Sequence, residues 1–249
     1  MLVAGLREGI RVTKKILLIC FSILAVGTGF VYFGNDIART FENSRPSTCI
    51  GTPAKGSLIN GKRLPTRGKN FVTCSYLGAA LGRNSVHSLV REVVLDAYVQ
   101  LQKTHPDKYF VYGDAGRPSG GRLWPHITHR NGLSVDFMVP VTSREGKSIP
   151  LPCNVLNKWG YNLEFDKGGV SGGMKIDFPA LAAHLYFLND AARRRGIKLR
   201  IVILSPELQQ FLFRTRYGNV LKSQVRFSRT PAWVRHDDHY HVDFQVPCR

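Results

Sequence analysis

The sequence has few acidic residues and no dense run of Lys and Arg. Only 17 Asp and Glu stand against 35 Lys and Arg in 249 residues, so the formal net charge is +18. Such an excess favours a polyanionic neighbour, which can be nucleic acid, anionic lipid or an acidic polymer. Nucleic acid is rejected as a partner because no nucleic-acid-binding motif occurs. Internal repeats and low-complexity tracts are also lacking, and a hydrophobic fraction of 43% predicts a globular chain with a full core.

Charged residues are absent from residues 16–33, an apolar run that follows four cations: Arg7, Arg11, Lys14 and Lys15. As a helix, this run is about 27 Å long, nearly enough to cross a bilayer core. Because positive charge stays on the cytoplasmic side, the rest of the chain is expected outside. The prediction is a cytoplasmic segment 1–15, a single-pass signal-anchor 16–33, a linker 34–48 and an exported domain 49–249. The alternative is a signal peptide cleaved near Ala25 and Gly27, which would leave a soluble exported domain.

Four cysteines follow the apolar run, and an even number in an exported domain suggests two disulfides. Three pairings are open, and the sequence does not choose among them. Our guess is that Cys49 pairs with Cys248, joining the two ends of the domain, and that Cys74 pairs with Cys153.

Helical and strand patterns are mixed along the domain without a regular alternation. Apolar residues at helical spacing predict helices over 84–104 and 177–196, and strands are predicted over 109–112, 133–141, 198–204 and 240–246. Residues 142–177 are rich in glycine and are expected to form a long irregular excursion. The fold class predicted is therefore α+β, with a small central antiparallel sheet flanked by helices.

Five of the eight histidines lie in two short clusters, 126–136 and 236–243, each of which also contains Asp. His239 and His241 are two residues apart in a predicted strand, so both rings project from one face. Asp136 lies in an apolar strand, where a carboxylate is costly unless a cation or a metal pairs with it. His129 precedes it by seven residues. Two His and one Asp with an open fourth position are typical of a catalytic zinc site, so one Zn²⁺ is predicted.

Two simpler interpretations of the clusters stay open. Asp136 could pair with a buried Arg, and the histidines could bind metal adventitiously at the surface. Imidazole with a carboxylate also tolerates other divalent ions.

Three blocks in this order resemble the penicillin-insensitive murein endopeptidases, within the wider group of lysostaphin-type, D-Ala-D-Ala and hedgehog-like metallopeptidases. The blocks are the loop 113–122, then His126-x-x-His129-x-x-Gly132-x-x-Val135-Asp136, then His236-x-x-His239-x-His241-Val242. The resemblance covers roughly residues 49–248. No Glu precedes the last His, which favours the murein endopeptidase type over the D-Ala-D-Ala carboxypeptidases.

The resemblance implies a role for each site residue. His129, Asp136 and His241 would bind zinc, His239 would act as base or transition-state stabiliser, and His126 and His236 would be auxiliary residues at the rim. In the glycine-rich loop, Asp114 and Arg117 are expected to shape the site or bind a stem-peptide carboxylate, although a plain turn is an alternative. Asp243 is considered as an acceptor that orients a ligand.

The expected function is therefore hydrolysis of peptide cross-links or stem peptides in peptidoglycan, by a domain held in the periplasm by the bacterial inner membrane. A D,D- or L,D-carboxypeptidase is the first alternative, and a non-catalytic wall-binding module is the second. Local opening of the wall for an envelope or secretion complex is a further hypothesis. The chain departs from the family type in its anchor, in its end at Arg249 and in residues 142–177, so the bond that it cuts stays open.

Overall fold

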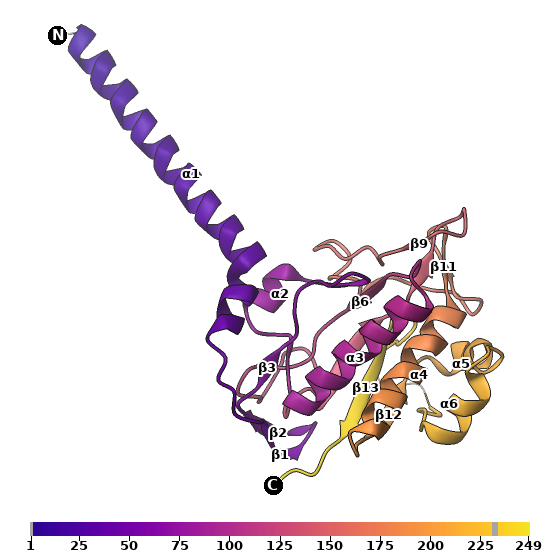
Figure 1. Cartoon of the computed structure of the whole chain (residues 1–249). Helices are drawn as coiled ribbons and strands as arrows, with labels where there is room; N and C mark the ends of the chain where they lie inside the picture. The colour runs from indigo at the N-terminus through magenta and orange to yellow at the C-terminus, as the bar shows by residue number, and fades with distance from the viewer. Residues whose placement is uncertain (1, 231–233) are drawn as a thin grey trace.

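The computed structural model describes residues 2–230 and 234–249. A long N-terminal helix, α1 (Leu2–Thr40), projects from a mixed α/β domain (Figure 1). Its segment Lys14–Thr40 is long and apolar enough to cross a membrane, a test that a signal sequence also passes. The side chains of residues 2–13, including Arg7 and Arg11 of the predicted cytoplasmic segment, lie outside the described part of the structure.

The segment expected to be a linker begins as the last turns of α1. Asn35 is fully buried; its side-chain amide donates to the Leu64 carbonyl at 3.1 Å and its Oδ1 accepts from Asn84 at 3.0 Å. Farther along, the Glu42 carboxylate pairs with Arg91 at 2.6 Å. Residues 34–48 are therefore not a free tether, because buried polar contacts join α1 to the domain.

The domain is built on a five-stranded sheet with strand order β12-β13-β7-β6-β4. The strands are β4 (Phe71–Thr73), β6 (Phe110–Tyr112), β7 (Ser134–Met138), β12 (Lys198–Ile203) and β13 (His239–Gln245). The four predicted strands are confirmed within a few residues, and β4 lies in the stretch 49–83, where a composition rich in Gly, Pro, Ser and Thr predicts loops and short strands without their bounds. The predicted antiparallel pairing is confirmed for β12 with β13, β13 with β7 and β7 with β6, whereas β4 pairs with β6 in parallel at one edge.

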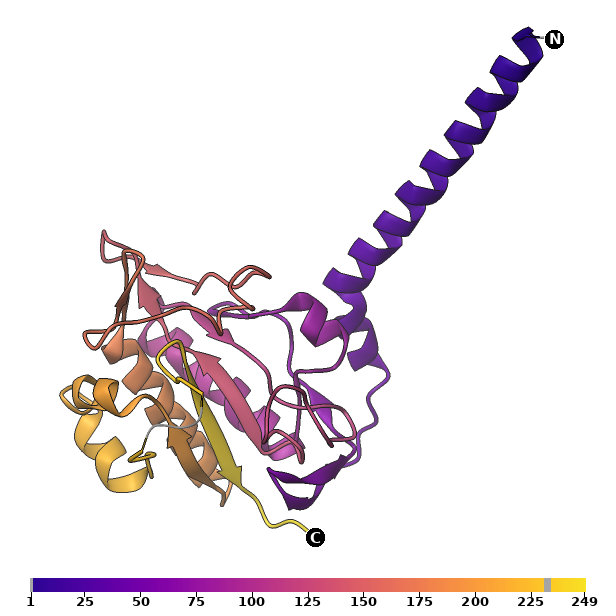
Figure 2. The same cartoon turned by 180° about the vertical axis from the view of Figure 1, so that it is seen from behind.

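Two helices, α3 (Ser88–Thr104) and α4 (Phe178–Arg194), pack on one face of this sheet (Figures 1 and 2). His184 of α4 contacts the rings of Phe110, Phe137 and Tyr240 on three neighbouring strands. The predicted α+β class is confirmed. The N-cap of the first helix is His87, three residues after the predicted start at Asn84, because Ser85–Val86 (β5) instead pairs with Lys62–Arg63 (β3).

Smaller elements surround this core. The predicted excursion 142–177 contains short strands that form a second, four-stranded sheet with Val141–Thr142 (β8): β9 (Ser148–Ile149), β10 (Val170–Ser171) and β11 (Met174–Ile176). The remaining elements are the hairpin β1 (Thr48–Thr52) and β2 (Lys55–Ile59), and the helices α2 (Tyr76–Ala80), α5 (Pro206–Phe213) and α6 (Gly218–Gln224).

One of the two suggested disulfides is present. Cys49 is bonded to Cys248, which joins β1 to the end of the chain. The suggested pairing of Cys74 with Cys153 is wrong for this structure, where both are free thiols. The Cys74 thiol donates a hydrogen bond to the carbonyl of Trp159 instead.

Candidate metal centre

The polar site lies on the sheet face opposite α3 and α4. Along β13, His239, His241 and Asp243 alternate with Tyr240, Val242 and Phe244, and successive side chains of a strand point to opposite faces. Tyr240 contacts His184 of α4, so the histidines face away from the helices. Asp136 of β7 is directly opposite His241 in the antiparallel register. Strand pairing thus brings together two residues that are 105 positions apart.

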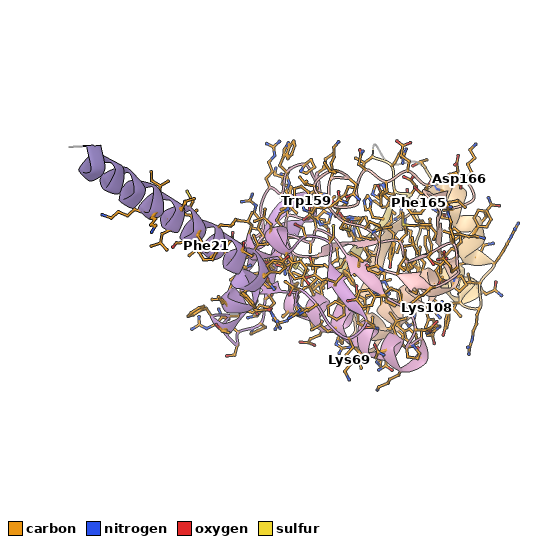
Figure 3. The ribbon with its side chains drawn as sticks, turned by 90° about the horizontal axis from the view of Figure 1, so that it is seen from above. Phe21, Lys69, Lys108, Trp159, Phe165 and Asp166 are labelled. Atoms are coloured by element: carbon orange, nitrogen blue, oxygen red, sulfur yellow. A yellow bond between two sulfur atoms is a disulfide. The ribbon has the colours of Figure 1, made fainter. Side chains whose placement is uncertain are left out.

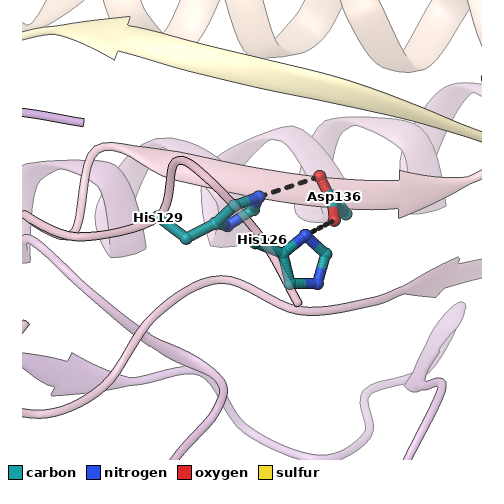
Figure 4. A group of neighbouring side chains, drawn as sticks. All are labelled: His126, His129 and Asp136. Carbon is teal, nitrogen blue, oxygen red and sulfur yellow. Dashed lines mark ion pairs between the residues drawn. The ribbon is translucent and has the colours of Figure 1, made fainter. Parts of the chain in front are cut away.

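Asp136 is the centre of the cluster, and three imidazole rings approach it. Its Oδ1 lies 2.8 Å from Nδ1 of His241 and 3.2 Å from Nε2 of His129, while its Oδ2 lies 3.6 Å from Nδ1 of His126. Figure 4 shows the rings of His126 and His129 directed at the carboxylate. One donor atom from each of His126, His129 and Asp136 lies within 4.8 Å of the others, a separation that one ion can bridge. His241 joins this trio through its contact with Asp136.

His129 reaches the cluster from a strained loop. Its φ is +67°, in the left-handed region that side chains with a Cβ rarely adopt. The Nδ1–H group donates to the Ala115 carbonyl at 2.8 Å, which turns Nε2 inward. With the proton on Nδ1, both the buried Nε2 and Asp136 Oδ1 at 3.2 Å are acceptors, so Nε2 makes no hydrogen bond among the described residues. A buried nitrogen without a partner is costly, and a bound cation would satisfy it.

Each inward-facing donor is held from behind by a second group. Asp243 Oδ1 accepts from His241 Nε2 at 2.9 Å, and the Tyr161 hydroxyl donates to Asp136 Oδ2 at 3.0 Å. His126 Nε2 lies 2.9 Å from Asp114 Oδ2. Such outer partners fix the orientation of metal-binding side chains. The donor set therefore fits a divalent ion that prefers nitrogen and oxygen.

Electrostatics favour a cation at this point. Burial alone would raise the pKa of Asp136, but the rings of His129 and His241 outweigh it and hold the pKa well below its usual range. Burial lowers the pKa of His129, which favours its neutral ring. For His241, burial is outweighed by the carboxylates of Asp136 and Asp243, which raise the pKa to about 10. The His241 proton occupies a position that a metal ion would take, since metal binding releases protons from its ligands.

His239 and His236 form a neighbouring pair. The His239 ring is buried, and its Nδ1 lies 2.5 Å from Oδ1 of Asp238, so its Nε2 is the free nitrogen. The ring of His236 lies 4.6 Å from that of His239 and is partly exposed. Burial lowers the pKa of His236 to about 4, so its ring is neutral at neutral pH. The structure thus brings together all five histidines of the two clusters.

The two predicted residues of the glycine-rich loop lie differently. Asp114 lies beside the cluster and pairs with Arg83 at 2.5 Å as well as with His126. Arg117 is exposed and forms no ion pair within the described residues. Sequence analysis did not identify Arg83, whose guanidinium pairs with Asp114 beside the cluster, because it lies outside the three blocks.

Tyr161 is the main site residue that sequence analysis missed. Besides binding Asp136, its oxygen accepts the Asp114 N–H at 2.9 Å, and its ring lies 4.8 Å from that of His239. Gly113 makes room for it, because a Cβ at that position would lie 2.4 Å from the tyrosine oxygen. Tyr161 comes from the excursion 142–177, where no periodic pattern indicated its position.

The comparisons with known proteins agree with these motifs. A family model described as penicillin-insensitive murein endopeptidase matches residues 49–249. No curated protein matches the chain. Because the match covers most of the chain, including both histidine clusters, the chain belongs to the penicillin-insensitive murein endopeptidase family.

Proposed function

We propose that this protein is a zinc-dependent peptidoglycan endopeptidase that hydrolyses peptide cross-links or stem peptides of the bacterial cell wall. One observation carries the proposal: His129 Nε2 and His241 Nδ1 lie 3.2 and 2.8 Å from the same Asp136 oxygen in a buried site. These three residues are the proposed ligands of one Zn²⁺. His126 is proposed as an auxiliary residue, since its Nδ1 faces the same carboxylate.

When bound, zinc supplies a Lewis acid that polarises the scissile carbonyl and acidifies an attacking water. The protein's own residues would move the protons. His239, oriented by Asp238, is the proposed general base, with its free Nε2 accepting a proton from the water and returning it to the leaving amine. His236 is the second candidate for the latter step. Its neutral ring lies beside His239 but has no carboxylate to orient it, since its Nδ1 bonds to the Val234 carbonyl.

Substrate contacts are proposed for the loop 113–130. The Asp114 carboxylate already bonds to Arg83 and His126, so its proposed role is to orient the His126 ring and not to bind substrate. Arg117 is exposed and free to bind a stem-peptide carboxylate. The net charge of +18 suits a polymer with acidic stems.

The proposed location is the bacterial inner membrane, crossed once by residues 16–33, with the domain in the periplasm. The positively charged residues before the apolar run support this orientation, because such residues stay on the cytoplasmic side of the membrane. A peptidase held there acts close to the membrane. This placement suits local opening of the wall during assembly of an envelope or secretion complex. The proteins of that complex would then be partners of this chain.

The test is mass spectrometry of muropeptides after incubating sacculi with the zinc-loaded full chain, with a chelator control. Loss of cross-linked dimers is expected, and both His129→Ala and His241→Ala should abolish it. Release of a single terminal residue would instead assign a carboxypeptidase. Binding to sacculi without any cleavage would assign a wall-binding module. Comparing the cleavage rates of His239→Ala and His236→Ala would show which of the two histidines carries out each proton transfer.

A further inference from the structure

A short segment beside the site exposes apolar side chains. Within five successive residues, Val155 is 68% exposed, Leu156 90% and Trp159 39%, and Lys158 is exposed between them. Scattered exposed apolar residues are ordinary on a protein surface, whereas a group of them beside a functional site marks a contact surface. We call residues 153–163 the apolar loop.

Backbone hydrogen bonds and left-handed residues define the conformation of the apolar loop. Lys158, Trp159 and Gly160 have positive φ values of 50°, 56° and 92°. Asn157 fixes the turn from within, because its side chain accepts from the Asn154 and Gly160 N–H groups, both at 2.9 Å. The Trp159 carbonyl accepts from the Cys74 thiol. In this backbone conformation the side chains of Leu156 and Trp159 are exposed.

The apolar loop lies at the end of the domain from which α1 leaves. Cys74, its partner, directly precedes α2, whose N-cap is Ser75. The ring of Tyr76, the first residue of α2, lies 5.4 Å from that of Tyr32, in the last part of the apolar run of α1. Figure 3 shows Trp159 at the α1 end of the domain, and in both Figures 1 and 2 the apolar loop lies near α2.

The position of the apolar loop relative to the apolar run is defined, because α1 enters the domain as a continuous helix. Asn35 is buried two residues after Phe33, the last residue of the apolar run. If the run crosses a bilayer, the membrane surface therefore lies beside α2 and the apolar loop. Trp is common at the bilayer boundary, Lys extends its charge to the headgroups, and anionic lipids attract a basic protein.

We propose that the apolar loop rests on the outer surface of the membrane that α1 crosses, with Leu156 and Trp159 at the lipid boundary and Lys158 among the headgroups. The partner is a phospholipid surface. The proposal rests on the membrane span proposed above. Since Tyr161 of the same loop binds Asp136, the metal centre would face the wall strands nearest the membrane.

The test uses the full chain reconstituted in phospholipid vesicles with brominated acyl chains, which quench nearby tryptophans. A quenched component of the fluorescence is expected in the parent protein and should be lost in Trp159→Phe but kept in Trp124→Phe. Leu156→Asp should reduce the quenching. Val99→Asp is the matched control, because Val99 is 52% exposed on α3 and lies outside the apolar loop.

An alkaline wash of the vesicles distinguishes this proposal from that of the membrane span, because a chain that spans the bilayer stays in the membrane during the wash. If the chain stays in the membrane but Trp159 is not quenched, the apolar loop does not touch lipid and the proposal is wrong, while the span stands. If the wash releases the chain and Trp159 is not quenched, both fail. Fluorescence that responds to soluble muropeptides and not to brominated lipid would assign the apolar loop to the substrate, which also overturns the proposal.

Discussion

The Nε2 atom of His241 lies 2.9 Å from Oδ1 of Asp243, two residues farther along the same strand. Ser134 on β7 donates to that oxygen at 2.5 Å, and Arg200 on β12 pairs with the other oxygen of the carboxylate. His241 is thereby held through Nε2, which leaves Nδ1 directed at Asp136. Three adjacent strands thus cooperate to orient one proposed ligand.

Asp243→Ala is expected to weaken zinc binding by about 10- to 100-fold, since outer partners of metal ligands have effects of this size. Affinity would be measured by competition with a chromogenic chelator, with circular dichroism as a check on folding. Asp243→Asn keeps the shape and one acceptor oxygen, so it should lose less. Asp190→Ala is the control, because this carboxylate is on the surface of α4 and pairs with Arg194. Unchanged affinity in Asp243→Ala would refute the orienting role.

Tyr161→Phe removes the hydroxyl that donates to Asp136 Oδ2 and is expected to lower zinc affinity by about tenfold. Oδ2 would then lose the hydrogen bond that helps to fix the plane of the carboxylate. The same competition assay measures the effect. Tyr186→Phe removes a hydroxyl from α4, on the other face of the sheet, and should leave the affinity unchanged. Equal affinities for both variants would mean that Tyr161 does not position Asp136.

His184 should make the fold sensitive to acid. Burial lowers its folded pKa to about 3, while the unfolded side chain titrates near about 6.5. Between these values the unfolded chain holds the proton and the folded chain does not, so stability falls as the pH falls. This group contributes a slope of about 1.4 kcal/mol per pH unit below about pH 6.5. In denaturation of metal-free protein from pH 7 to 5, His184→Gln should show a shallower slope, and identical slopes would contradict the prediction.

Asn35→Ala should lower the free energy of unfolding by about 1–3 kcal/mol, because it leaves the Leu64 carbonyl and the Asn84 amide with fewer partners in a buried site. Asp36→Ala is the neighbouring control, where the exposed carboxylate pairs with Arg39 at 3.6 Å and the change should stay within about 0.5 kcal/mol. Thermal or chemical unfolding of the full chain in detergent measures both. If the two variants were equally stable, α1 would not be joined to the domain through Asn35.

The disulfide between Cys49 and Cys248 closes a separation of 199 residues. Its removal in Cys49→Ser is expected to cost about 2–5 kcal/mol of unfolding free energy. Thiol labelling of the denatured, unreduced parent should modify Cys20, Cys74 and Cys153, as counted by mass spectrometry. Labelling of Cys20 alone would mean that the second pair is bonded after all.

Most helices and strands of the domain were predictable, because they follow from local patterns of apolar and polar residues. The period of two puts His239 and His241 on one face, and helical spacing located α3 and α4 within a few residues. The bounds of the parallel edge strand β4 were not predicted, because its three residues lie in a stretch rich in Gly, Pro, Ser and Thr that indicates only loops and short strands. The start of α3 was misplaced because the competing pairing of Ser85 with Arg63 is a contact between distant segments.

The sequence by itself determined the donor types, their order and the apolar run, since each depends on residue identity and short spacing. Only the tertiary structure decided that Tyr161 reaches Asp136, that Arg200 and Ser134 hold Asp243, and that α1 continues into the domain through Asn35. The physical reason is that local periodicity sets the face from which a side chain projects. Which segments meet across that face depends on strand register and core packing, which involve the whole chain at once.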